Sequence, residues 1–87
     1  MLTAPIGQEF RFCNGRASGN LMDFFSVLKT LSAGDFSHHV NSEKNDFYNW
    51  IFHSLNERGL AAKVKNLKTN AAFIRNIGSF LRKKPKA

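Results

Sequence analysis

A chain of 87 residues is long enough for one domain and too short for two that each bury a core. Its hydrophobic content of 43%, which includes nine Phe, one Trp and one Tyr, is enough to form a core without disulfide bonds or structural metal ions. The single cysteine, Cys13, excludes an internal disulfide and a cysteine-based zinc knuckle, and no apolar run is long enough to predict a transmembrane helix.

The first residues lack the charged and apolar regions of a signal peptide. A lone cysteine and the absence of a glycosylation sequon also fit a reducing compartment, so we expect a cytoplasmic protein. We expect one domain over residues 1–87, with residues 1–8 as a candidate disordered segment and residues 82–87 as a basic tail.

The first predicted element is a short β-hairpin. Residues 9–13 alternate charged and apolar side chains, and Asn14-Gly15 is a strong signal for a hairpin turn. Residues 16–18 are the expected return strand. Because two strands alone are marginal in water, Phe10 and Phe12 should pack against the helices that follow.

Two helices are predicted next. From Asn20, which suits the N-cap position, apolar residues recur at helical spacing as far as Leu31. Ser32 suits the N-cap of a second, shorter helix, in which Phe36 and Val40 form an apolar pair four residues apart.

The third predicted helix covers residues 44–56, where apolar residues again recur at helical spacing. Tyr48 and Phe52 lie off its apolar stripe. Either the helix is buried on two sides, which we favour, or these two rings form an exposed aromatic patch that could bind another protein.

Two more helices complete the pattern, a short one over residues 60–67 and a longer one capped by Thr69. Gly78 weakens the last helix and indicates close approach to a neighbouring element. The predicted fold class is mainly α, with a short N-terminal β-hairpin packed on a bundle of four to five short helices. Its predicted core is Phe10, Phe12, Leu21, Phe24, Phe25, Leu28, Leu31, Phe36, Val40, Phe47, Trp50, Ile51, Leu55, Leu60, Val64, Phe73, Ile74 and Ile77.

Residues 39–51 resemble a motif of a small, uncharacterised archaeal and bacterial domain family, His-Val-x-x-x-Lys-Asn-Asp-Phe-x-x-Trp-Ile. The matching positions are Asn14-Gly15, Phe36, His39-Val40, Lys44 to Phe47, Trp50-Ile51 and Leu60-Ala61. The resemblance covers roughly residues 9–65 and implies the fold described above, but it implies no activity. A role shared with that family would lie in residues 40–51, whereas the basic end departs from the family's pattern.

Charge is divided unevenly along the chain. Residues 1–57 carry a net charge of −2, whereas residues 58–87 carry nine cations and no acid. Such an asymmetry is typical of proteins that bind a polyanion. On a helix over residues 70–84, cations would lie opposite the apolar face. We therefore predict nucleic-acid binding through Lys63, Lys65, Lys68, Arg75, Arg82, Lys83 and Lys84.

Other interpretations of the basic end remain open. It could be a solubilising face, or it could bind an acidic protein. A membrane surface is disfavoured because the core needs Phe80 and Leu81, and no lipidation signal supplies a second anchor. The pattern favours neither DNA nor RNA and gives no oligomeric state.

The sequence predicts neither a metal site nor a cofactor. Adjacent His38 and His39 would point about 100° apart on a helix, and nothing in the spacing brings His53 to them. We expect His39 to form hydrogen bonds across the junction of the second and third helices, and His38 to be solvated. Catalysis would need His39 near Asp46 with a nucleophile such as Ser42, but no other element of an active site accompanies them. We therefore expect a protein that is not an enzyme.

Overall fold

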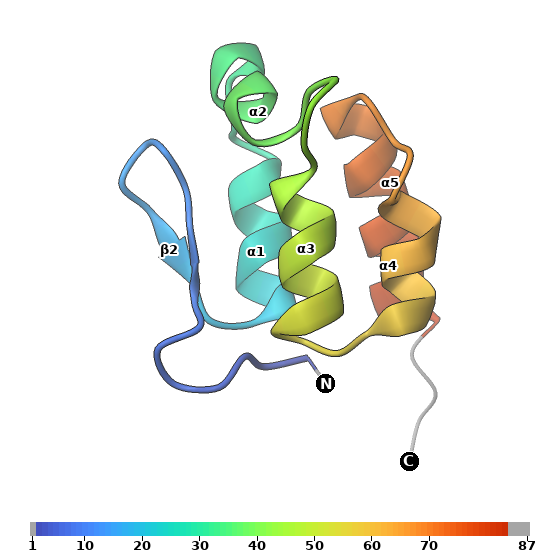
Figure 1. The fold of residues 1–87 in the computed structure, drawn as a ribbon. Helices are drawn as coiled ribbons and strands as arrows, with labels where there is room; N and C mark the ends of the chain where they lie inside the picture. The colour runs from blue at the N-terminus through green and yellow to red at the C-terminus, as the bar shows by residue number, and fades with distance from the viewer. Residues whose placement is uncertain (1, 84–87) are drawn as a thin grey trace.

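The computed structural model describes residues 2–83, which form a two-stranded hairpin followed by five helices (Figure 1). This arrangement confirms the predicted, mainly α fold class. The elements in chain order are β1 Phe10–Arg11, β2 Ala17–Ser18, α1 Leu21–Leu28, α2 Ala33–His39, α3 Asp46–His53, α4 Arg58–Val64 and α5 Asn70–Arg82.

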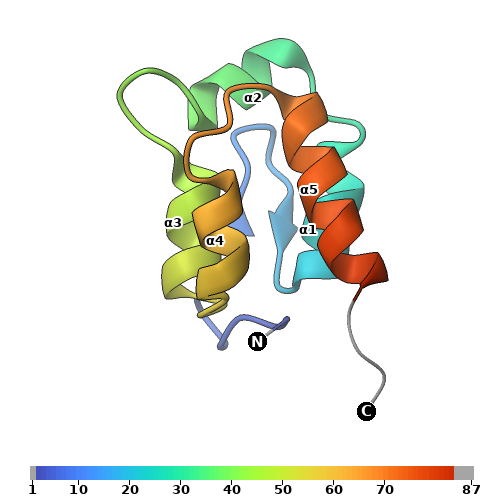
Figure 2. The ribbon, with the colours of Figure 1, turned by 90° about the vertical axis from the view of Figure 1, so that its right-hand side faces the viewer.

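The helices form a small bundle with the hairpin on one side. α3 packs against α4, and α5 packs against both α1 and α4. Figure 2, turned by 90° from Figure 1, shows α4 and α5 towards the viewer, with α3 beside α4, α1 beside α5 and α2 across one end. Within residues 2–83, no helix has both the length and the apolar character needed to cross a membrane.

The hairpin pairs β1 and β2 antiparallel, with Phe10 opposite Ser18. Its turn is a three-residue loop: the Phe12 N–H donates to the Arg16 carbonyl at 2.8 Å, and the Gly15 N–H donates to the Phe12 carbonyl at 3.0 Å. Gly15 has φ of 95°, a conformation that glycine adopts without steric penalty. The Asn-Gly signal therefore identified the turn correctly, because Gly15 is the residue that closes it.

The predicted N-caps of three helices are confirmed. The side-chain oxygens of Asn20, Ser32 and Thr69 each accept a hydrogen bond from the backbone N–H three residues later, at 2.8–3.2 Å. The end of α1 differs from the prediction, because the helix stops at Leu28 and not near Leu31. The Leu28 carbonyl accepts two hydrogen bonds there, from the Leu31 N–H at 3.2 Å in a tighter turn and from the Asn70 side-chain amide at 2.8 Å.

Most of the predicted core is buried. Phe25, Leu31 and Ile74 are exceptions, because each is only half-buried at the margin of the cluster. The core also contains three residues that the prediction left out, Ala4, Val27 and Ala61. The apolar pattern did not identify the two alanines as core residues because a small side chain contributes little to such a pattern.

One aromatic ring, that of Phe47, lies at the centre of the core. It is fully buried, and its centroid lies 5.1–6.1 Å from the rings of Phe10 and Phe12 beside the hairpin turn and of Phe24 in α1. It also lies 5.8 Å from the Phe36 ring in α2 and 5.3 Å from the Phe73 ring in α5. Most of these pairs meet edge to face, the arrangement that the charge distribution of aromatic rings favours.

Residues 2–8 are attached to the rest of the fold near both ends, whereas Ile6 between them is fully exposed. The Ala4 N–H donates to the Gly19 carbonyl at 2.8 Å, and the Leu21 N–H donates to the Leu2 carbonyl at 2.8 Å. Trp50 holds the other end of this segment, because its indole N–H donates to the Gln8 carbonyl at 2.7 Å. The Trp50 ring also stacks on Phe24, with centroids 4.9 Å apart.

Truncation of Trp50 tests this packing. The side chain is 6% exposed, so Trp50→Ala leaves a cavity and an unpaired carbonyl, and we expect it to lower the free energy of unfolding by about 3–5 kcal/mol in urea titration. Trp50→Phe keeps most of the apolar volume but loses the indole donor, so it should have a smaller effect. A Trp50→Ala protein that unfolds at the parental urea midpoint would contradict the central placement of Trp50.

Candidate functional site

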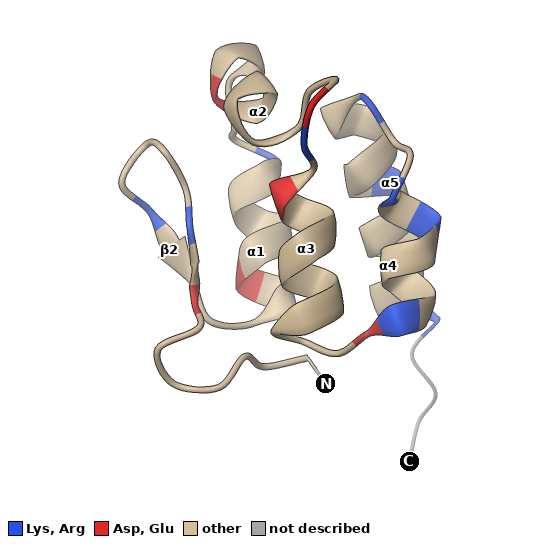
Figure 3. Ribbon diagram, in the orientation of Figure 1, with Lys and Arg blue, Asp and Glu red and all other residues tan. Residues whose placement is uncertain are grey.

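The predicted phosphate-contacting residues lie on α4, on the loop after it and on α5, where the blue segments gather in Figure 3. Lys84 lies outside the described residues. The other six are exposed: Lys63, Lys65, Lys68, Arg75, Arg82 and Lys83. We call these six residues the basic surface.

No carboxylate neutralises the basic surface from within its own segment, because residues 58–83 contain neither Asp nor Glu. The acidic residues lie on or near the hairpin, α1, α2 and α3 and just before α4, as the red segments of Figure 3 show. Among residues 2–83, the ion pair formed by a lysine or arginine joins Lys44 to Asp46 at 3.1 Å, and none involves the basic surface. Its positive charge is therefore directed to solvent.

Two of these cations, Lys65 and Arg82, lie at different edges of the structure. The Lys65 ammonium lies 5.8 Å from the Tyr48 ring centroid, on the side where α4 meets α3. The Arg82 guanidinium lies beside Gly78, at the contact of α5 with Phe25 of α1. A β-carbon built on Gly78 would lie 3.3 Å from Nη1 of Arg82 and 3.2 Å from Cζ of Phe25. The close approach predicted at Gly78 is thus confirmed, and α1 is the neighbour.

Tyr48 and Phe52 are half-buried, between the two states that the sequence left open. Their ring centroids are 5.7 Å apart, since residues four positions apart share one side of a helix. A cation lies over each ring: Lys65 over Tyr48, and Arg58 over Phe52 at 5.4 Å. We call these four residues the aromatic–basic edge.

Arg58 was not among the predicted contact residues. A signal for it was present in the sequence, because Arg58 and Lys65 are seven residues apart and share one face of a helix. What the sequence did not supply was the antiparallel contact of α3 with α4, which brings this face beside Tyr48 and Phe52.

The side chain of Asn45 holds α3 and α4 in this relation. Its Oδ1 accepts a hydrogen bond from the Tyr48 N–H at 2.9 Å, which caps the start of α3. Its Nδ2 donates to the carbonyls of Val64 and Lys65, both at 3.1 Å, at the end of α4. One amide therefore satisfies free backbone groups at the ends of two helices.

Substitution of Asn45 tests this bridge. Asn45→Ala removes a cap and two cross-helix hydrogen bonds, and we expect it to lower the free energy of unfolding by about 2–4 kcal/mol in chemical denaturation. Asn45→Ser retains a capping hydroxyl but cannot reach α4, so its loss should be intermediate. Equal stability of the Ala and Ser variants would show that the cap contributes nothing.

His39 is 4% exposed and joins three parts of the chain. Its Nε2 accepts the Cys13 N–H at 3.0 Å, and its Nδ1 lies 3.1 Å from Oδ2 of Asp46. The proton of the neutral ring therefore resides on Nδ1 and is donated to the carboxylate. The predicted hydrogen bond across the junction of the second and third helices is confirmed, and His38 is exposed as predicted.

His39 lies next to Asp46, as catalysis by these residues would require, but its hydrogen bonds hold the fold together. A general base needs a free lone pair directed at the group it deprotonates. The Nε2 lone pair of His39 is occupied by a backbone amide, and the ring is buried. Within residues 2–83, no group of three or more His, Cys, Asp or Glu side chains is arranged to hold a metal ion.

Cys13 lies beside Asp35, with its Sγ 3.4 Å from the carboxylate Oδ1. Partial desolvation, the hydrogen bond to Asp35 and the negative charge of that carboxylate together raise the pKa of the Cys13 thiol. The thiolate is the nucleophilic form, so this environment suppresses the reactivity of Cys13 near neutral pH.

The raised pKa predicts slow thiol chemistry. A higher pKa leaves less thiolate at pH 8, so Cys13 should react with a disulfide reagent more slowly than a cysteine in an unstructured peptide, and its rate profile should be displaced to higher pH. Asp35→Asn removes the neighbouring charge and should accelerate the reaction. If Cys13 instead reacts faster than the free peptide, the assigned role of Asp35 is wrong.

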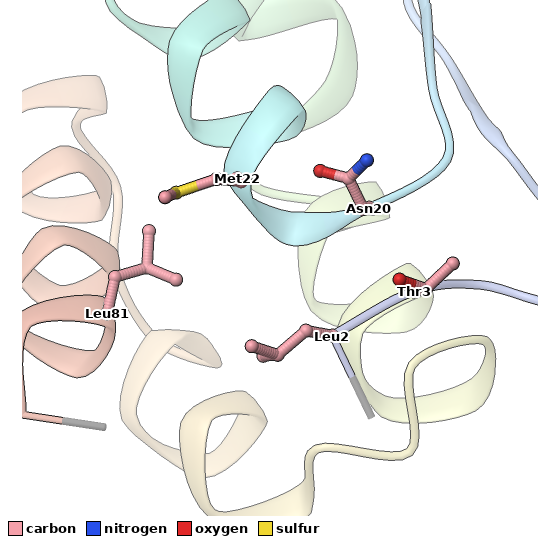
Figure 4. Close-up of a pocket in the computed structure, with 5 residues that line it drawn as sticks. All are labelled: Leu2, Thr3, Asn20, Met22 and Leu81. Atoms are coloured by element: carbon pink, nitrogen blue, oxygen red, sulfur yellow. The ribbon is translucent and has the colours of Figure 1, made fainter. Parts of the chain in front are cut away.

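A pocket of about 360 Å³ lies between the N-terminal segment, the start of α1 and the end of α5 (Figure 4). Leu2, Met22 and Leu81 supply most of its wall, with Thr3 and Asn20 at its side. The Asn20 Oδ1 is already used to cap α1. With no charged group in its lining, this pocket does not extend the basic surface.

Comparisons with families of known proteins, with curated proteins and with solved structures find no match to this chain. The resemblance of residues 39–51 to an uncharacterised domain family therefore stays a prediction.

Proposed function

We propose that this chain is a non-enzymatic binding module that binds nucleic acid through the basic surface on α4, the following loop and α5. The observation that carries the proposal is a segment of seven cations and no acid over residues 58–83, six of them forming the basic surface without a carboxylate partner in the described chain. Nucleic-acid backbones present closely spaced negative charges, and cations that contact them release condensed counterions.

The layout of charge supports this proposal over a solubilising role. Charges that serve solubility are usually interspersed in sign, whereas residues 58–83 carry one sign only and the acids lie on other segments (Figure 3). The field of such a face attracts a polyanion and accelerates its association. His39 and Cys13 support the absence of catalysis, because neither presents a free, activated group.

A second candidate function is a protein-interaction module that uses the outer side of α3. The half-exposure of Tyr48 and Phe52 favours it, since aromatic residues that remain accessible are common at protein interfaces. Lys65 and Arg58 beside these rings would select an acidic partner.

Salt dependence is the primary test of nucleic-acid binding. We expect the affinity for a generic duplex, a single strand or an RNA to fall by about 10³-fold or more between about 50 and 200 mM salt if six or more cations contact phosphates. Gel-shift titrations at both salt concentrations measure this directly. Absence of binding to all three nucleic acids at the lower concentration would refute the proposed function.

Charge reversal locates the surface. The double variant Lys63→Glu and Lys68→Glu should weaken binding and reduce the slope of log affinity against log salt concentration, because it removes phosphate contacts. Arg11→Glu with Arg16→Glu changes net charge by the same amount on the exposed hairpin and serves as the matched control. An equal effect of the two double variants would show that net charge, and not this surface, governs binding.

A further inference from the structure

The aromatic–basic edge combines the two chemical groups that bind an unpaired nucleotide. Tyr48 and Phe52 lie 5.7 Å apart on one side of α3 and remain half-exposed. Lys65 and Arg58 approach the same rings from α4. Aromatic rings stack on bases, and cations beside them bind the phosphates that connect those bases.

We propose that the aromatic–basic edge binds single-stranded nucleic acid, with bases stacked on Tyr48 and Phe52 and phosphates held by Arg58 and Lys65. This inference rests on the proposed function and specifies its ligand. It adds Arg58 and two aromatic residues to the basic surface and assigns them a role that charge alone does not supply.

In the free protein, the cations cover the rings that a base would use. Their centroid distances of 5.4 and 5.8 Å are near the outer limit of cation–π contact, and both cations are on exposed side chains. Such a contact changes an equilibrium by roughly two- to fivefold, whereas stacking of one base changes it by roughly 5- to 150-fold. A base therefore displaces the cation from the ring, and the cation moves to a phosphate.

The accessible ring faces favour a single strand over a duplex. In a duplex, bases are stacked on each other and paired, so a ring outside the helix meets only sugar, phosphate and base edges. An unpaired base presents its whole face. Lys68 lies three residues beyond Lys65, in the loop after α4, where it can contact the continuing backbone, whereas Lys63 lies on the other side of α4 from Arg58 and Lys65.

The test uses the full chain and three labelled probes of about 15 nucleotides: oligothymidylate, oligouridylate and a duplex of mixed sequence. Fluorescence anisotropy at about 100 mM salt should show that the single strands bind more tightly than the duplex, and comparison of the first two tells DNA from RNA. Tyr48→Leu and Phe52→Leu should each weaken single-strand binding by about 5- to 100-fold without changing the salt slope, whereas Tyr48→Phe should bind as the parent does.

Phe25→Leu is a matched control for the rings. Phe25 is also half-buried and also lies under a cation, with the Lys29 ammonium 4.5 Å from its centroid, but it belongs to the α1 edge. Its substitution should leave single-strand affinity unchanged. An equal loss in Phe25→Leu and Tyr48→Leu would overturn the assignment to the aromatic–basic edge.

Crosslinking keeps the proposal testable if a leucine variant fails to fold. When irradiated, an oligonucleotide that carries 5-iodouracil forms a covalent crosslink with an aromatic side chain stacked on that base. Irradiation of its complex with the unaltered protein should therefore crosslink Tyr48 or Phe52. Labels confined to other residues, or duplex binding as tight as single-strand binding, would overturn this inference and leave the proposed function standing. Failure of every nucleic acid to bind would refute both.

Discussion

The fold depends on the burial of one ring, that of Phe47. It is the position at which the hairpin, α1, α2 and α5 all meet α3, through contacts with five phenylalanine rings, four of them edge to face. A chain of this size has only one core, and burial of a Phe side chain contributes about 1.5–3 kcal/mol before any specific ring contact. Loss of the ring would open a cavity that borders nearly every element at once.

Several residues near Phe47 in the sequence maintain this arrangement. Asn45 joins α3 to α4, the Asp46 carboxylate accepts a hydrogen bond from His39, and Trp50 fixes the N-terminal segment. We expected that any role shared with the family resembled by residues 39–51 would lie in this part of the chain. Asn45, Asp46 and Trp50 in this segment serve the fold, whereas Tyr48 remains half-exposed and belongs to the aromatic–basic edge.

Much of the fold could be predicted because the sequence carries local signals for it. Caps at Asn20, Ser32 and Thr69 lie where residue type and helical spacing place them, and the hairpin forms at Gly15. The ends of helices were harder to predict. At the end of α1 the Leu28 carbonyl accepts the side-chain amide of Asn70, 42 residues away in sequence, and no local pattern predicts such a partner.

The candidate site was predicted only in part, because it too depends on contacts between residues that are distant in sequence. Composition alone identified a segment of cations without acids, but the direction of each cation depends on which helix lies beside it. Lys65 and Arg82 were assigned to one surface, yet they lie at different edges because α4 packs on α3 and α5 packs on α1. The two functional hypotheses, one for the basic end and one for the aromatic side of α3, looked independent in sequence.

The contact of α3 with α4 makes these two hypotheses interdependent. A protein partner and a nucleic acid would compete for the same rings, because the cations that favour a polyanion lie directly over Tyr48 and Phe52. A neutral apolar partner would have to displace or desolvate two charges, which is unfavourable without a compensating anion. A nucleic acid supplies that anion in its phosphates and a stacking surface in its bases, so it fits the proposed role of this edge better than an apolar protein surface does, and an acidic protein would compete with it for the same cations.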